Sequence, residues 1–159
     1  MARKDITMNK SEIQNFLSSG AKVLQVATLG NDGSPHLAPM WFVMDDGKVV
    51  FRSFSKSQKI VNMVRDPRIS VLAEAGDAYA ELQGVMIRGT ARLVTDPQYV
   101  LKIYGGLAAR YPMVGDVPVD LDDQALEAAF GRFAPKNTAV IVEPNTIASW
   151  DHTKLGGAY

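Results

Sequence analysis

The stretch FRSFSKSQKIVNMVRDPR, residues 51–68, contains the end of a strand, a polar turn and a helix in direct succession. Its aromatic start is typical of a strand, and Ile60, Met63 and Val64 have the spacing of one helical face. Pro67 predicts the end of that helix, because a proline pushes the residue before it out of the helical region. The turn between strand and helix gathers hydroxyl and ammonium side chains, namely Ser53, Ser55, Lys56, Ser57 and Lys59.

This turn allows two interpretations. If Ser57 is the N-cap, the free N–H groups of the first turn and the helix dipole favour an anion such as a phosphate there. Lys59 then reaches back to the anion, and Ser53 and Ser55 add hydroxyl donors. The alternative is an ordinary serine cap with solvated lysines. The dipole disfavours a cation in the first helical turn, so the position of Lys59 favours the phosphate site.

The overall composition limits the classes of function. The 159 residues suit one domain with a core of its own. Lys plus Arg equals Asp plus Glu, 17 each, so no global basic field attracts nucleic acid or an anionic membrane. The absence of cysteine excludes disulfides, thiolate metal sites and thiol catalysis. The N-terminal residues lack an apolar signal-peptide core and no segment has membrane-spanning length, so we expect a soluble, cytoplasmic protein.

Outward from this stretch, polar turns such as NDGS at 31–34 separate a series of strands and helices. Three capping residues predict where helices start. They are Ser11, paired with Gln14, Asp96 before Pro97, and Asp122. We predict strands at 22–30, 36–45, 49–54, 68–75, 78–94 and 137–150, with bends at Gly84, Gly89 and Pro144. We predict helices at 9–19, 57–66, 97–111 and 123–133.

Short turns join the early strands to one another, so neighbouring strands are antiparallel and the first three form a meander. A doubly wound parallel sheet needs a helix between successive strands, and these helices are missing. We therefore predict a mainly β (α+β) fold, a closed or nearly closed antiparallel barrel with peripheral helices. It forms a single domain over residues 1–159, with a core at 9–150 and a polar tail at 151–159. That tail is either a lid over a bound ligand or a disordered end.

These segments together resemble a known family. The order of a helix, ATLGNDGSPHLAPMWFV (27–43), the segment 45–72 and GVMIRGTARLV (84–94) is similar to that of the pyridoxamine-phosphate-oxidase-like split β-barrel flavoproteins. The chain resembles more closely the actinobacterial branch that uses the deazaflavin coenzyme F420. The similarity covers roughly residues 9–150. Its most specific part is a strand, a serine-rich turn, a lysine, and then Asn-x-x-x-Asp-Pro-Arg at 62–68.

The resemblance implies a cofactor site around the polar turn. The phosphate-binding lysine of the family matches Lys59, and the turn serine matches Ser57. The strand-end pair that contacts the cofactor matches Arg52 and Ser53. In the oxidases an arginine precedes the lysine, whereas this chain has Gln58, and this departure weakens the expected grip on the phosphate of FMN.

A second part of the implied site is the strand at 37–42, which matches the strand whose backbone lies against the flavin ring. This match implies cofactor contacts from Leu37, Pro39, Met40 and Trp41. A strand that faces a ring instead of another strand does not need every N–H for a ladder hydrogen bond, which explains a proline in its middle. Gln83 and Gly84 match a further contact. In this family two subunits pack barrel to barrel around the cofactor, so Trp150 is expected near the partner's site; the alternative is simple packing.

The resemblance implies a homodimeric oxidoreductase that transfers a hydride between reduced F420 and a small conjugated or unsaturated organic substrate. The lack of a clear nucleophile–base pair counts little against this function, because such a cofactor carries the hydride chemistry. Water, Tyr79 and Lys56 stay open as proton donors, and the acidic tail of the deazaflavin is expected near Lys56, Arg88 and Lys154. Two alternatives stay open: an FMN-dependent oxidase or flavin reductase of the same fold, and a non-catalytic protein that binds flavin or haem.

No metal site is expected. His36 and His152 lack the ligand spacing of a zinc site. The acidic loop at 115–123 lacks the spacing of an EF-hand. The expected partners are a second copy of the chain and a small-molecule substrate, with neither nucleic acid nor membrane.

Overall fold

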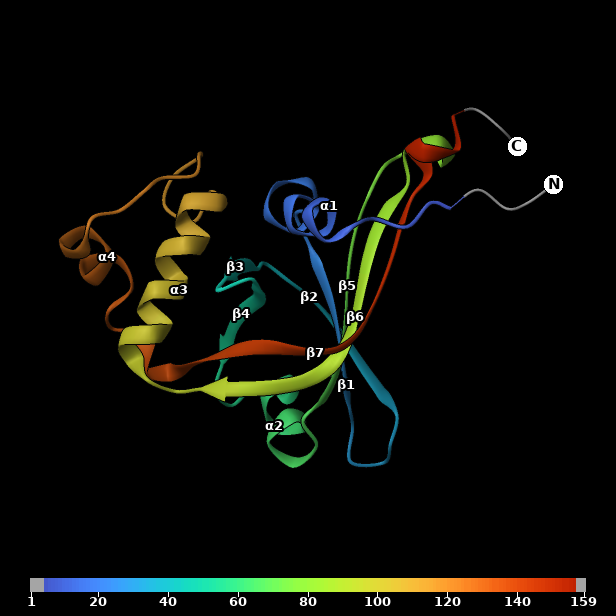
Figure 1. Cartoon of the computed structure of the whole chain (residues 1–159). Coiled ribbons are helices and arrows are strands. Elements are labelled where there is room, and N and C mark those ends of the chain that lie inside the picture. The colour runs from blue at the N-terminus through green and yellow to red at the C-terminus, as the bar shows by residue number, and fades with distance from the viewer. Residues whose placement is uncertain (1–4, 157–159) are drawn as a thin grey trace.

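One antiparallel sheet dominates the computed structural model, which describes residues 5–156 (Figure 1). Its strands lie in the order β2-β1-β5-β6-β7-β4-β3. They are β1 Leu24–Leu29, β2 Pro35–Met40, β3 Val43–Asp45, β4 Lys48–Phe54, β5 Arg68–Ala75, β6 Gln83–Val94 and β7 Asn137–Asp151. The α-helices are α1 Lys10–Asn15, α2 Gln58–Arg65, α3 Pro97–Arg110 and α4 Asp123–Phe130. The predicted mainly β fold with peripheral helices is confirmed.

The prediction of one strand over 36–45 is wrong, because the chain leaves the sheet at Trp41 and Phe42. β2 lies at one edge of the sheet and β3 at the opposite edge, so the predicted meander of three early strands is also wrong. Met40 and Val43 are three residues apart, which limits the distance between their Cα atoms to about 11 Å. The two edges come this close because the sheet curls round on itself. The chain itself, and not a ladder of hydrogen bonds, joins the edges, which makes the barrel a split one.

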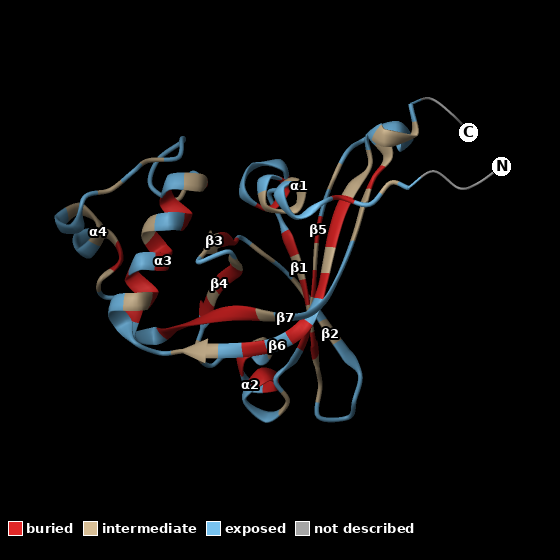
Figure 2. Ribbon diagram, viewed as in Figure 1, coloured by how far each residue is buried: buried red, intermediate tan, exposed pale blue. Residues whose placement is uncertain are grey.

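Two hydrophobic cores lie on the two sides of β4 and β7 (Figure 2). Successive residues of a strand point to opposite faces of the sheet. Val49 and Phe51 belong to the core that fills the barrel, whereas Val50 and Ile141 pack in a second core with α3 and α4. Because β4 is buried on both faces, residues 49–51 form a continuous apolar run instead of an alternating one.

β6 and β7 form the longest ladder of the sheet, and they bend at a β-bulge. The register shifts between Arg88 and Gly89, opposite Pro144, which confirms the predicted irregularity there. Gly84, predicted as a second bend, instead pairs in regular register with Trp150. A Cβ atom at Gly84 would overlap the Trp150 ring, so this glycine makes room for the tryptophan.

Two further local predictions were wrong. Residues 79–81 form a 3₁₀ turn, η2 Tyr79–Glu81, and not the start of a strand. The capping box of α1 is Asn9 with Glu12 and not Ser11 with Gln14, because Asn9 already has the extended backbone of an N-cap. The other predicted N-caps, Asp96 and Asp122, are confirmed.

The C-terminal segment is fastened to the start of the chain. The Asp151 N–H donates to the Ile6 carbonyl at 2.7 Å, and the Lys154 ammonium lies 2.7 Å from a Glu12 carboxylate oxygen. The predicted tail thus packs on the N-terminal segment as far as it is described, and residues 157–159 lie outside the described part. Among residues 5–156, no helix is long and apolar enough to cross a membrane.

Candidate functional site

Three side chains of the polar turn converge at the start of α2. Ser53 Oγ and Ser57 Oγ are 2.9 Å apart, and the Lys59 ammonium donates to Ser53 Oγ at 3.3 Å. Ser57 has the backbone of an N-cap, yet its side chain accepts no hydrogen bond from the helix. An ordinary serine cap would place its oxygen on an N–H of the first turn. We call Ser53, Ser57 and Lys59 the cradle. Because the Ser57 hydroxyl bonds to Ser53 and not to the helix, the N–H groups of the first turn of α2 can bind an anion.

Lys59 is a cation without a carboxylate partner. It forms no salt bridge with any residue between 5 and 156. Partial burial lowers the pKa of its ammonium below the usual value, and the helix dipole at this position also opposes a positive charge. A phosphate in the cradle would satisfy the ammonium, the two hydroxyls and the N–H groups together. Ser55, the other serine of the turn, is instead engaged by Thr138 at 2.8 Å.

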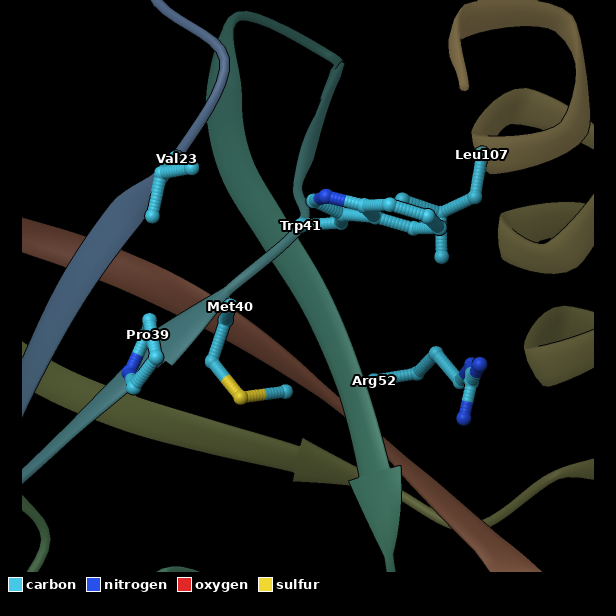
Figure 3. Close-up of a pocket in the computed structure, with 6 residues that line it drawn as sticks. All are labelled: Val23, Pro39, Met40, Trp41, Arg52 and Leu107. Carbon is cyan, nitrogen blue, oxygen red and sulfur yellow. The ribbon is translucent and has the colours of Figure 1, made fainter. Parts of the chain in front are cut away.

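A cavity of about 340 Å³ opens beside the crossover, Trp41–Phe42 (Figure 3). The end of β2, the crossover, β4 and α3 all contribute to its walls. The residues that line it are Val23, Pro39, Met40, Trp41, Arg52 and Leu107. In Figure 3 the Trp41 ring and the Arg52 side chain both extend toward the α3 side, with Leu107 near the end of the ring.

Backbone hydrogen-bonding groups are also unpaired where the two edges of the sheet meet without a ladder. β3 pairs with β4 only as far as Val50, so residues 51–54 have a strand partner on one side alone, which is β7. β2 pairs with β1 and with no other described strand. Unpaired strand edges offer N–H and C=O groups to a ligand. Pro39, which has no N–H to donate, is placed on such an edge strand, as its residue type requires.

Arg52 lies between the cavity and the second core. One of its terminal nitrogens donates to Asn137 Oδ1 at 3.2 Å, and its guanidinium lies 4.2 Å from the centre of the Tyr104 ring. Burial lowers the pKa of Arg52, an effect that Tyr104 partly offsets, but the side chain stays protonated at neutral pH. Its Nε is buried without a hydrogen-bond partner.

The end of α3 holds the crossover in place. The Trp41 ring stacks on the Tyr111 ring at 4.7 Å and 8° between planes. The Tyr111 hydroxyl lies 2.9 Å from the Lys22 carbonyl and 3.1 Å from that of Phe42. Arg110 donates to the carbonyls of Phe42 and Ala21 and lies over the Phe42 ring. The cavity wall therefore depends on contacts from a helix far along the chain.

Replacing Arg110 with Met is expected to lower the free energy of unfolding by about 2 kcal/mol, because two carbonyls lose a charged donor. Trp41 fluorescence should change as well, since the crossover is released. Tyr111→Phe keeps the stacked ring and loses only the hydroxyl, so we expect about 1 kcal/mol. Urea denaturation followed by circular dichroism measures both variants, with Arg132→Gln, an exposed arginine, as the control. Equal stability of Arg110→Met and the control would contradict this role of α3.

The structure brings most of the predicted site residues into two neighbouring groups. Pro39, Met40, Trp41 and Arg52 line the cavity, and Ser53, Ser57 and Lys59 form the cradle. The two groups join through β4, on which Arg52 and Ser53 are adjacent. Leu37 is 66 % exposed on the edge strand β2 and does not line the cavity.

The remaining predicted residues, Gln83, Gly84 and Trp150, lie elsewhere in the same chain. Through β7, Arg52 is in register with Ala139 and then with Val94 of β6. Gly84 is ten residues from Val94 along β6, which corresponds to roughly 33 Å of strand. Within one copy of the chain these three residues therefore form a separate group, in which Trp150 covers Gly84.

Sequence reasoning missed the residues that support the two groups. Asn62 is fully buried in α2, where its amide donates to Thr28 at 3.1 Å and accepts from Gln58 at 2.8 Å. Asn62 is two positions after Ile60 and so lies across the helix from the predicted apolar face of Ile60, Met63 and Val64, which gave no signal for its burial. Val64, predicted on that face, is instead 72 % exposed. Leu107 and Tyr111 carried no signal either, because their position beside Trp41 depends on tertiary packing alone.

The suggested proton donors do not line the cavity. Tyr79 lies on η2, where its ring contacts the His152 ring at 4.6 Å, and Lys56 is exposed in the turn before α2. Arg88 and Lys154, expected near a cofactor tail, also lie outside the cavity. No group of three or more potential metal ligands occurs within residues 5–156.

Comparison with known proteins gives the family. Residues 10–150 match the sequence profile described as pyridoxamine 5'-phosphate oxidase. A conserved hypothetical protein from Mycobacterium tuberculosis, Rv2991, has 34 % sequence identity and a TM-score of 0.88, over 100 % of this chain and 94 % of that one. A search of curated protein sequences found no match.

More distant solved structures share the fold. An F420 reductase superposes with a TM-score of 0.62 at 22 % identity, over 84 % of this chain and 94 % of that one. An FAD-binding protein from Mycobacterium smegmatis has a TM-score of 0.56 at 18 % identity, over 90 % of this chain and 96 % of that one. At these identities the likeness concerns the fold alone.

Proposed function

Because the chain belongs to the pyridoxamine 5'-phosphate oxidase family of split-barrel proteins, we propose that it is an oxidoreductase that uses the deazaflavin F420. In this proposal it transfers a hydride between the reduced cofactor and a small conjugated organic substrate. The observation that carries the proposal is the cradle. Ser57 does not cap its helix, and Lys59 has no carboxylate partner in residues 5–156.

The residues present fit such a cofactor. Lys59, Ser57 and the first-turn N–H groups of α2 would hold its phosphate. The unpaired edge of β2, with Pro39 and Met40, would lie along the edge of the ring system. When bound, the reduced cofactor supplies the hydride, and the protein orients it and excludes water.

The number of cations in the cradle favours F420 over FMN. FMN carries a phosphate monoester, with a charge of about −1.5 to −2 at neutral pH, whereas F420 carries a phosphodiester with a single charge. The cradle holds one ammonium, from Lys59. Gln58, which stands where the oxidases have an arginine, is turned toward Asn62 at 2.8 Å. An F420 reductase among the proteins of the same fold agrees with this choice, while FAD-binding proteins of that fold keep a flavin as the second candidate.

We further propose that the active form is a homodimer. Gln83, Gly84 and Trp150 lie too far from the cradle of their own chain to share a ligand with it. A second copy can bring its Trp150 to the cradle. On the outer face of the sheet, Leu37 of β2 is 66 % exposed and could take part in this contact. Two positions along β2, a row in register crosses the same face and is apolar except for Gln25; it consists of Pro39, Gln25, Leu72, Met86 and Ala148.

Analytical ultracentrifugation tests the dimer. The wild-type protein is expected to sediment as a dimer and Leu37→Asp as a monomer, because a charge on the apolar face must be desolvated in the contact. Lys22→Asp, on an exposed position, is the control. If the monomeric variant still binds F420 as tightly as the dimer, the cofactor site does not need the second copy.

Titration at several pH values tests the cofactor. Binding of F420 to the wild-type protein should change little between pH 5 and 8 and weaken at higher pH, because only the protonated Lys59 attracts the phosphate. The decline should begin below the usual lysine range, since burial lowers the pKa of Lys59. FMN is expected to bind more weakly, and its affinity should rise between pH 5 and 7 as its second phosphate proton, with a pKa near 6, is lost. If FMN binds more tightly than F420, the protein is an FMN-dependent enzyme of the same fold. If it binds a cofactor but turns over no acceptor, it is a non-catalytic binding protein.

A further inference from the structure

We propose that the cavity beside the crossover binds the organic substrate, and that Arg52 selects planar, conjugated molecules that carry a carboxylate. This inference rests on the proposed function, because it names the substrate class of the same site. It assigns to Arg52 a role different from the cofactor contact that the family resemblance implies.

The charge of Arg52 has no counter-charge in the described chain. The side chain forms no salt bridge with any residue of the described chain, and its Nε is buried without a partner. The groups around the guanidinium are neutral, namely the Asn137 amide and the Tyr104 ring. Arg52 is half-buried, and a partly desolvated cation without a counter-charge is unfavourable, so an anionic ligand would stabilise it. An arginine binds a carboxylate in a planar, bidentate way.

The walls of the cavity are flat and mostly apolar. Trp41 forms one wall, held flat by its stack on Tyr111. Met40, Leu107 and Val23 add apolar side chains, and among residues 5–156 Arg52 is the one charged residue in the lining. A volume of about 340 Å³ lies within the usual range for a small-molecule pocket. Flat aromatic and apolar walls with one cation suit a planar, conjugated acid.

Arg52 and the cradle lie on opposite sides of β4. Arg52 and Ser53 are neighbours on β4, so their side chains point to opposite faces of the sheet. Ser53 faces the cradle, where it accepts from Lys59 at 3.3 Å, and Arg52 faces Tyr104 in the second core. β4 thus lies between two cations, with Lys59 of α2 beside Ser53 on one side and Arg52 on the other. The first would bind the cofactor phosphate and the second another anionic ligand.

Equilibrium binding to the protein without cofactor provides the test. Trp150→Phe leaves Trp41 as the remaining tryptophan, so its fluorescence reports on the cavity. Cinnamate is the probe, and cinnamyl alcohol is a neutral molecule of similar shape. We expect cinnamate to quench Trp41 and to bind at least about 10-fold more tightly than the alcohol, as for a hydrogen bond to a charged group. Equal affinity for the acid and the alcohol would overturn the proposal.

Variants assign the effect to Arg52. In the same background, Arg52→Gln should weaken cinnamate binding about 10-fold or more and leave binding of the alcohol within about 2-fold. Arg52→Lys keeps the charge and should retain part of the preference for cinnamate over the alcohol. This variant keeps the proposal testable if Arg52→Gln does not fold. Arg132→Gln removes an exposed arginine and should behave like the parent. Loss of acid and alcohol binding together in Arg52→Lys would show a structural role only and overturn the assignment.

A final arm separates this proposal from that of the cofactor. F420 binding to the wild-type protein, which keeps Trp150, is followed through the absorbance of the deazaflavin, with and without cinnamate. Undiminished cinnamate affinity in the presence of bound F420 supports two separate sites. Competition between them would mean that the cavity belongs to the cofactor, which overturns the substrate pocket and leaves the proposed function intact. Cinnamate binding without any F420 binding would instead remove the proposed function and keep the anion pocket.

Discussion

Lys59→Ala is expected to weaken the binding of F420 by roughly 1.5–3 kcal/mol, or about 10- to 150-fold, while the fold stays intact. The Lys59 ammonium is the cation of the cradle, 3.3 Å from Ser53 Oγ. The alanine removes the charge that pairs with the phosphate and leaves the two serines and the helix N–H groups. Some affinity should therefore remain.

Stability separates this functional loss from a structural one. Lys59 lies in the first turn of α2, where the dipole opposes a cation, and burial lowers its pKa. Its removal should leave the free energy of unfolding unchanged or raise it by a few tenths of a kcal/mol. Isothermal titration with F420 and urea denaturation measure the two quantities, and Lys22→Ala, exposed elsewhere, is the matched control. Unchanged F420 affinity, or unfolding of the variant, would show that the cradle is not a phosphate site.

Gly89→Ala is expected to lower the free energy of unfolding by about 3 kcal/mol, because the new Cβ has no space. It would overlap the carbonyl oxygen of Glu143, a backbone atom of the neighbouring strand. Since Gly89 lies at the bulge that bends β6 and β7, relief of this overlap requires the two strands to separate. A loss of this size is a large share of the stability of an ordinary domain, about 5–15 kcal/mol.

A second glycine provides the control for this prediction. Gly105 lies within α3, and a Cβ there would come 3.2 Å from the end of the flexible Leu126 side chain. Alanine also favours a helix over glycine by about 1 kcal/mol. Gly105→Ala should therefore be neutral or slightly stabilising. Thermal unfolding of both variants by circular dichroism distinguishes them, and a Gly89→Ala protein as stable as Gly105→Ala would rule out the close approach of the strands at the bulge.

The bulge also has a consequence for the proposed site. β6 and β7 extend from the end that holds the Gln83–Asp151 pair to the end beside α3 (Figure 1). The cradle and the cavity lie toward the α3 end, whereas Gln83 and Trp150 lie at the opposite end. In the proposed dimer, the bend of these strands sets where Trp150 of one copy meets the cradle of the other. Gly89→Ala should therefore reduce F420 affinity as well as stability.

The sequence by itself determined the features that depend on neighbouring residues. Turn residues located the hairpin at 31–34, and Asp96 and Asp122 located two helix starts, because caps and turns are made by side chains within a few positions of one another. The cradle belongs to this class. Ser53, Ser57 and Lys59 are close along the chain, so a strand followed by a helix is enough to bring them together.

The tertiary structure alone decided the features that depend on pairing between distant segments. The pattern of residues 36–45 gives no information on which strand pairs with which, so the sequence could not show that β2 and β3 form opposite edges joined at the crossover. The same holds for Arg52, whose neutral surroundings come from Tyr104 and Asn137, and for Trp41, whose place in the cavity wall depends on Tyr111. Sheet order and the environment of a buried charge are set by long-range packing and desolvation, which local patterns do not encode.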